Sequence, residues 1–330
     1  MNSRFYLVTG GAGFIGAPLV KRLTRDGHKV RVLDNQSRGS AARLGDLEKE
    51  IEFVSADIRD RDAVQKAAMG VESVIHLAFI NGTEFFYSRP DLVLDVGVRG
   101  MINVLDACIA QGVGELALAS SSEVYQTPPA IPTPETAPLS IPDPHNPRYS
   151  YAGGKIISEL MAINFGRKRF DRVLIFRPHN VYGPDMGWEH VIPQLTVRMK
   201  RLAEAADGPI RLPIQGTGEE TRAFIFIDDF VEGVRVLLDK GEHLQIYHVG
   251  TMDQVSIAQV ASLLGEYFRR EVRLEPGEPA KGGTARRCPD TSKIAALGFH
   301  PKVGFREGLF ITARWYEEHA HEAPSGLNIS

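Results

Sequence analysis

A tyrosine and a lysine, Tyr151 and Lys155, stand four positions apart in the sequence. On a helix such residues share one face, so the lysine ammonium can lie beneath the phenol. A nearby positive charge favours the phenolate and lowers the tyrosine pKa from its usual value near ~10. Such a tyrosine can take a proton from a hydroxyl while a hydride leaves the same carbon. The pair alone is weak, because an exposed tyrosine beside a solvated lysine has the same spacing. Its meaning depends on a hydride acceptor.

The start of the chain predicts a dinucleotide site. The apolar run Phe5–Val8 is typical of a buried strand, Gly10, Gly13 and Gly16 follow it, and Ala17–Leu23 has helical spacing. A phosphate-binding loop requires this order, because the helix start offers free N–H groups and a positive dipole end. The spacing is G-x-x-G-x-x-G rather than G-x-G-x-x-G, and a structural turn is the alternative.

A carboxylate then indicates which dinucleotide is bound. Asp34 ends the second predicted strand, Lys29–Leu33, about 20 residues after the glycines. It is expected to bind ribose hydroxyls and to repel a 2′-phosphate, which favours NAD. Arg31 and Arg38 keep NADP as an alternative.

Two further predicted strands lead to the same site. Ile51–Ala56 ends at Asp57, which is expected beside the adenine edge, and Ser73–Ala78 ends in small and apolar residues expected beside the cofactor. His76 lies in that last strand with no acid or nucleophile near it in sequence, so a packed histidine is expected rather than a catalyst.

Composition limits the class of protein. With 330 residues, 43% of them hydrophobic, and a net charge of −3, the chain can bury a large sheet and a second lobe, and its charge gives no reason to expect nucleic acid or a membrane as a partner. Cys108 and Cys288 provide neither a disulfide framework nor a metal site. Reduced thiols, no recognisable signal peptide and no long apolar run favour a cytoplasmic enzyme.

Alternating strand and helix patterns continue to Val173–Phe176 and predict an α/β fold, a doubly wound parallel (Rossmann) sheet with a smaller C-terminal substrate-binding lobe. We expect an NAD-binding domain over residues 1–177 and a lobe over residues 178–330, with segments returning to the first domain. Ile225–Ile227 and Ile246–Val249 are the strands expected to return. The eight prolines of Gln126–Arg148 predict a loop, either a flap beside the site or a passive connection.

A serine cluster follows the predicted strand Glu115–Ala119, where ligands of an open α/β sheet bind. A hydroxyl of Ser120, Ser121 or Ser122 can donate a hydrogen bond to the substrate oxygen, and a helix cap or turn is the alternative. Glu123 can act as a base on a carbon acidified by a ketone, or it is an exposed loop residue.

These motifs, taken in order, resemble those of the extended short-chain dehydrogenase/reductases, specifically the NAD-dependent nucleotide-sugar epimerase/dehydratase group. The resemblance covers nearly the whole chain. It rests on Thr9–Gly16, Leu33-Asp34-Asn35, Asp57-Ile58, His76-Leu77-Ala78, Ser120–Tyr125, Tyr151 to Lys155, Asn180–Pro184, Arg222–Asp229, Asp290–Lys293 and Leu297–Pro301.

The resemblance implies a role for each matching residue. Tyr151 would be the acid/base, Lys155 its electrostatic partner and ribose ligand, and Ser121 the third member of the triad, with Glu123 as a further catalytic candidate. The implied cofactor-binding residues are Gly10, Gly13, Phe14, Ile15, Gly16, Asp34, Asn35, Asp57, Ile58, Leu77, Ala78, Tyr151 and Lys155. The implied substrate-binding residues are Ser122, Asn180, Arg222 and Arg287. A tightly held NAD and a homodimer formed through a helix bundle are also implied.

Three departures from the family pattern stand out. Gly97 replaces a frequent asparagine, which leaves the support of that helix open, and Gln126 replaces a glycine at the start of the proline-rich loop. Pro178 and His179 replace a bulkier pair, so the pocket is expected to differ there, with His179 a candidate substrate contact.

The implied reaction begins with oxidation of a nucleotide-sugar, most simply at C4, to a transient keto-sugar by hydride transfer to NAD, whose cationic ring also favours the phenolate. Return of the hydride to the opposite face of the sugar gives the C4 epimer, the reaction of an epimerase. Ser122 stands where 4,6-dehydratases carry an aspartate, which disfavours that reaction. Ser122–Tyr125 is similar to UDP-glucuronate decarboxylases, and Leu33–Gly39 to 4-epimerases. Epimerisation therefore leads, C5 chemistry with Glu123 or a keto-sugar reductase are alternatives, and the intact triad disfavours a non-catalytic binding module.

Overall fold

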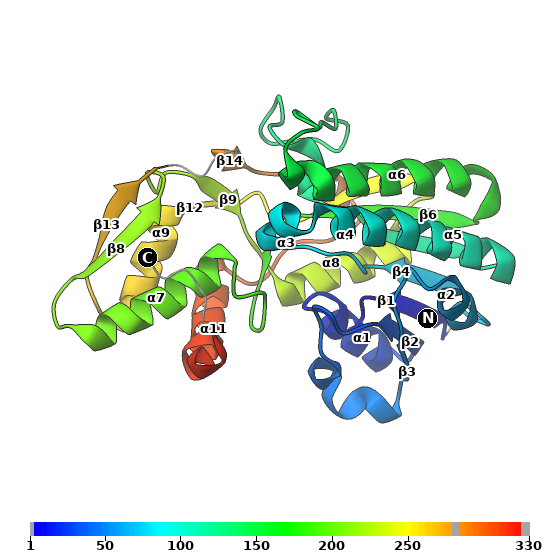
Figure 1. Cartoon of the computed structure of the whole chain (residues 1–330), viewed down its shortest axis with the longest axis horizontal. Helices are drawn as coiled ribbons and strands as arrows, with labels where there is room; N and C mark the ends of the chain where they lie inside the picture. Colours follow the sequence, from blue (N-terminus) through cyan, green and yellow to red (C-terminus); the bar gives the residue numbers. More distant parts are fainter. Residues whose placement is uncertain (1–2, 279–283, 325–330) are drawn as a thin grey trace.

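A parallel sheet of seven strands lies at the centre of the protein, which we describe from a computed structural model over residues 3–278 and 284–324. The strand order is β11-β6-β5-β4-β1-β2-β3 (Figure 1). The strands are β1 (Phe5–Thr9), β2 (Lys29–Asp34), β3 (Glu52–Ser55), β4 (Ser73–His76), β5 (Glu115–Ala119), β6 (Arg172–Pro178) and β11 (Gln245–Val249). The order reverses between β1 and β4, which opens a crevice at the carboxyl ends of the strands.

Helices cover both faces of this sheet because successive side chains of each strand point to opposite sides. Leu7 packs on the face of α2 (Arg61–Ala67), α5 (Gly100–Gln111) and α6 (Ser150–Arg169). Val8 packs on the face of α1 (Gly16–Arg25) and α8 (Ile227–Lys240). The expected doubly wound α/β fold is therefore confirmed.

The later chain returns to this sheet at one of the two expected places. β11 pairs with β6, as expected for Ile246–Val249. The expectation for Ile225–Ile227 is wrong, because β10 (Ile225–Phe226) pairs with β7 (Val181–Tyr182) in a separate two-stranded sheet and Ile227 begins α8. Two aspartates in the first turn of α8 stabilise its positive N-terminal end, which favours a helix start there.

A smaller lobe lies beside the sheet domain, at the left of Figure 1. It contains a two-stranded and a three-stranded sheet with helices packed on them. Its elements are α7 (Val191–Ala205), β8 (Ile210–Gln215), β9 (Thr221–Ala223), β12 (Gln254–Ser256), α9 (Ile257–Phe268), β13 (Val272–Gly277), β14 (Arg286–Arg287) and α11 (Phe305–Glu318). The short helix α10 (Ser292–Ala295) packs instead on β11 of the central sheet.

The proline-rich segment 126–148 is held against the protein. Thr133 forms an isolated bridge with Pro289, and the Glu135 carboxylate accepts a hydrogen bond from the backbone N–H of His248 at 3.0 Å. Arg148, at the end of the segment, lines the large cavity described below. A movement of this segment as a flap stays a prediction.

Across the described part of the chain, the length and apolarity needed to span a membrane are not reached by any helix.

Candidate active site

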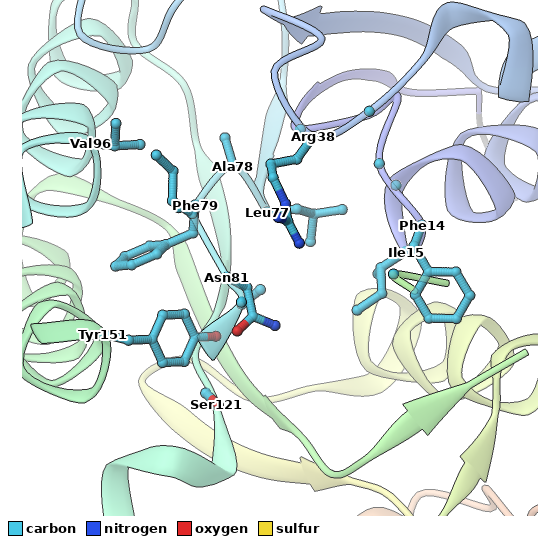
Figure 2. A pocket seen from close by; sticks show the side chains of 18 of the residues that line it. Phe14, Ile15, Arg38, Leu77, Ala78, Phe79, Asn81, Val96, Ser121 and Tyr151 are labelled. Carbon is cyan, nitrogen blue, oxygen red and sulfur yellow. The ribbon is translucent and has the colours of Figure 1, made fainter. Parts of the chain in front are cut away.

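A cavity of about 860 Å³ lies at the carboxyl ends of the central strands (Figure 2). Such a volume lies in the upper part of the range for ligand pockets. The glycine loop, Asp34 and the Tyr151–Lys155 pair all line it, although they are far apart in the sequence. The structure thereby brings the predicted hydride acceptor site and the predicted acid/base into one space.

The glycine loop leaves no room for side chains. Gly10 has φ +72°, and a Cβ there would lie 2.8 Å from the backbone nitrogen of Ala78. A Cβ on Gly16 would lie 2.1 Å from the carbonyl oxygen of Gly10. Gly13, Phe14 and Ile15 complete this cavity wall where α1 begins. The close turn and the helix start fit a pyrophosphate group.

The carboxylate predicted to bind ribose is fixed at the end of β2. Asp34 accepts hydrogen bonds from the backbone N–H groups of Ala12 at 2.9 Å and Gln36 at 2.7 Å. Asn35 donates to Asp57 at 3.0 Å, and both line the cavity with Asp34. These positions suit an adenosine ribose without a 2′-phosphate.

The arginines that left NADP open are engaged elsewhere. Arg31 bonds to Glu52 and to the carbonyls of Ala67 and Met69. Arg38 lines the cavity but pairs with Glu189. Ile58, Leu77 and Ala78 also line the cavity, as the sequence analysis implied.

Tyr151 and Lys155 lie in the first two turns of α6. Both side chains are buried, and both line the cavity. The Ser121 hydroxyl lies close enough to the Tyr151 phenol to affect its pKa, and Figure 2 shows the phenol oxygen facing the cavity with Ser121 beside it. Lys155 Nζ donates to the carbonyl of Ala119 at 2.7 Å and lies 5.8 Å from the centre of the Tyr151 ring. The structure therefore brings the three predicted triad members together.

The expected tuning of Tyr151 by Lys155 is wrong for the protein's own groups. Burial raises the pKa of Tyr151 to about 12, and the neighbouring Ser121 hydroxyl opposes this only in part. Burial also lowers the pKa of Lys155 to about 7. An environment of low polarity disfavours both charged forms, which helical spacing alone does not reveal. A phenolate at neutral pH thus needs further positive charge beside it.

Glu123 lines the cavity but is paired with an arginine. Its carboxylate accepts a short hydrogen bond from Arg287, which also lines the cavity. Burial alone would raise the pKa of Glu123, but the charges of Arg287, Arg148 and Arg222 hold it below its usual value. A paired carboxylate of low pKa is a weak base.

The remaining predicted substrate contacts divide into two groups. Ser122 and Asn180 line the cavity, and the Asn180 amide donates to the carbonyl of Ala223 at 3.1 Å. Arg222 is not among the residues that line it. Burial and the neighbouring Arg287 lower the pKa of Arg222 to about 10, and its guanidinium donates to the carbonyl of Thr221 at 2.8 Å.

The two histidines singled out in the sequence are packed side chains. His76 lies in β4 beside the Thr9 hydroxyl at 2.7 Å, and burial lowers its pKa to about 3. His179 does not line the large cavity. Its ring packs against His248 at 4.6 Å, and neither ring nitrogen has a hydrogen-bond partner among the described residues.

Sequence reasoning missed two parts of the site. The first is a pair of phenylalanines, Phe79 and Phe86, that pack on Tyr151. The concentration of aromatic residues in the segment 79–87 was the available signal.

The second is a pair of ion pairs that we call the clasp, Arg38–Glu189 at 2.5 Å and Arg43–Asp185 at 2.6 Å. All four residues line the cavity, and they join the loop after β2 to the loop after β7. In Figure 2 the Arg38 side chain extends into the cavity between Phe79 and Ile15.

Comparison with known proteins is decisive here. The sequence profile of the NAD dependent epimerase/dehydratase family matches residues 6–250. The chain belongs to this family. Among its relatives, a dTDP-4-dehydro-6-deoxy-D-allose reductase of Streptomyces bikiniensis is 31% identical over 96% of this chain and 97% of that protein. A UDP-glucose 4-epimerase of Mycolicibacterium smegmatis is 32% identical over 94% of this chain and 97% of that protein.

Solved structures of this epimerase/dehydratase family agree with the fold. A dTDP-glucose 4,6-dehydratase of Streptomyces venezuelae, solved with NAD bound, has a TM-score of 0.84 and 29% identity over 98% of this chain and all of that chain. NAD is therefore the cofactor. The relatives also include a UDP-glucuronic acid decarboxylase of Arabidopsis thaliana, 31% identical over 93% of this chain and 89% of that protein. The family thus leaves the individual reaction open.

The clasp generates a prediction about cofactor retention. Glu189→Gln removes the charge that holds Arg38, so NAD should dissociate about two- to five-fold faster, the effect of losing one partly exposed ion pair. The dissociation rate is measured by displacement of bound NAD.

Glu232→Gln is the matched control, because it breaks the similarly exposed pair Arg22–Glu232 away from the cavity. Equal NAD dissociation rates in wild type and Glu189→Gln, or equal acceleration in the control, would contradict the clasp's role.

Proposed function

We propose that the protein is an NAD-dependent nucleotide-sugar epimerase that inverts C4 through a transient keto-sugar. The observation that carries this proposal is the shared cavity, where Tyr151, Ser121 and Lys155 face the same space as the glycine loop and Asp34. NAD, when bound, supplies the acceptor and donor of the hydride. The glycine loop, Asp34 and Asn35 would hold it, and Lys155 would bind its ribose.

The chain's own residues then manage the proton. Tyr151 takes the proton from the C4 hydroxyl and returns it after the hydride comes back to the opposite face. Ser121 donates a hydrogen bond to the same sugar oxygen as charge develops on it. Asn180 and Arg287 line the cavity and are proposed to bind the nucleotide-sugar. Ser122, which also lines it, is proposed to contact the sugar. Arg222 is proposed to assist Arg287 through its own positive charge nearby.

The state of Glu123 supports C4 chemistry over C5 chemistry. A base that removes a carbon proton must be free to accept it, and this carboxylate is held by Arg287. A substrate that draws Arg287 away would release Glu123, which is how decarboxylation or other C5 chemistry would become accessible. The decarboxylases and the keto-sugar reductase among the relatives make both reactions the alternatives to exclude.

The experiment is incubation with UDP-, GDP-, CDP- and dTDP-sugars in deuterated water, without added cofactor. We expect inversion at C4 with no solvent deuterium in the product. Deuterium at C5 or C3 would instead assign a carbon base such as Glu123. A requirement for stoichiometric NAD(P)H would contradict the internal redox cycle. Tyr151→Phe should retain NAD and lose about 10²- to 10⁴-fold in turnover, the usual contribution of a general base.

We also propose that a second copy of the chain covers an apolar face of α5 and α6. Ile102 on α5 and Ile157, Leu160 and Phe165 on α6 are exposed large apolar side chains, and Leu160 is 54% exposed. Ile157 and Leu160 stand three residues apart and share one side of the helix.

This dimer is testable by light scattering. The wild type should have the mass of two chains, and Leu160→Glu should dissociate it, because a buried unpaired carboxylate is strongly unfavourable. Met252→Glu, at another exposed apolar residue outside α5 and α6, should remain a dimer. A monomeric wild type, or a dimeric Leu160→Glu variant, would contradict the proposed interface.

A further inference from the structure

The Lys155 ammonium lies over the face of an aromatic ring. An ammonium has three N–H donors. One of them reaches the carbonyl of Ala119, and among the described residues no other acceptor is bonded to Lys155. Its Nζ lies 4.1 Å from the centre of the Phe79 ring. That distance is well within the range of a cation–π interaction, which is strongest when both groups are shielded from water.

Phe79 contacts the other member of the pair as well. Its ring meets the Tyr151 ring edge to face at a centroid distance of 5.1 Å, and Figure 2 shows the two rings side by side. Phe86 stacks on Tyr151, also at 5.1 Å. Phe79 contacts both Tyr151 and Lys155, whereas the aromatic contact of Phe86 is to Tyr151.

Two glycines make the space that the Phe79 ring occupies. A Cβ on Gly97, in the π-helical turn Asp95–Arg99, would lie 2.3 Å from Phe79 Cζ. A Cβ on Gly154, on α6, would lie 2.9 Å from the same atom. The ring therefore fills the volume that a side chain at position 97 would take.

We propose that Phe79 is a positioning residue that holds the Lys155 ammonium against Tyr151 through its ring face. This rests on the proposed roles of Tyr151 and Lys155. Phe79 itself neither gives nor takes a proton.

The charged and titratable groups around Lys155 do not themselves hold its ammonium against Tyr151. Glu159, one turn further along α6, is the opposite charge that favours the ammonium, but it is tied to Arg177 at 2.6 Å. His76 is neutral near pH 7, since burial lowers its pKa to about 3. The Tyr151 phenol is also neutral until it loses its proton.

The test is the titration of Lys155 in the NAD-bound protein, followed by NMR of isotope-labelled lysine and assigned with Lys155→Arg. Phe79→Leu keeps an apolar cover over the ammonium and removes the ring. The pKa of Lys155 should fall by about half to one unit, the shift that a shielded cation–π contact accounts for. Phe86→Leu is the matched control and should leave the Lys155 pKa unchanged.

Gly97→Ala, alone and combined with Phe79→Leu, keeps the proposal testable if Phe79→Leu does not fold. Gly97→Ala should displace the ring and lower the Lys155 pKa, and in a Phe79→Leu background it should add little. If Phe79→Leu does not fold, Gly97→Ala alone decides. An unchanged or raised pKa in the informative variant, or an equal fall in Phe86→Leu, would overturn the proposal.

Turnover separates this proposal from the proposed function. In Phe79→Leu, Lys155 should lose its proton at a lower pH than in the wild type. The alkaline limb of the pH profile of turnover should therefore shift to lower pH by the same half to one pH unit. A wild type with no epimerase activity but the expected Lys155 titration would defeat the proposed function and leave the role of Phe79 standing. Normal epimerase activity with an unmoved titration would do the reverse.

Discussion

The burial of two ionisable side chains next to each other is the constraint on which the site depends. Surroundings of low polarity oppose a charge on Tyr151, whose pKa is raised to about 12, and on Lys155, whose pKa is lowered to about 7. The same surroundings strengthen the attraction between opposite charges. Neither side chain is well suited to its role alone, and a third charge beside them has a larger effect than it would have in water. A phenolate at Tyr151 near pH 7 therefore needs more positive charge beside it than this environment gives to Lys155 alone.

The rest of the fold keeps this pair in place. Lys155 is held by the last carbonyl of β5, and Glu159, one turn later on α6, accepts hydrogen bonds from Ser120 after β5 and from Arg177 in β6. Because this buried network joins two adjacent strands to the helix, the acid/base keeps a fixed relation to the crevice at the carboxyl ends of the sheet. The small lobe contributes Arg287, which pairs with Glu123 and completes the cavity wall.

Local patterns in the sequence were enough to predict the parallel sheet and the placement of Tyr151 and Lys155 on one helix. The choice of Ser121 came from the family resemblance, and the catalytic roles of all three residues stay predictions. β5 begins and ends where the pattern placed it, and the glycine loop stands between strand and helix as expected. The pKa of Tyr151, the clasp and the Phe79 ring could not be predicted, since each depends on burial or on contacts between distant segments. Arg38 and Glu189 are separated by 151 residues, and no local pattern pairs them. The expected return of Ile225–Ile227 to the central sheet failed because an apolar run of three residues shows neither which strand it pairs with nor where the next helix begins.

The most direct test of this account is a spectroscopic titration of the Tyr151 phenol with and without NAD⁺. The chain has nine tyrosines, so the signal is the difference in phenolate absorbance between the wild type and Tyr151→Phe. We predict that this difference titrates at about pH 12 in the protein alone and moves below ~8 when NAD⁺ is bound, because its cationic ring would favour the phenolate. A Tyr151 titration that stays at the same pH with and without NAD⁺ would contradict the account.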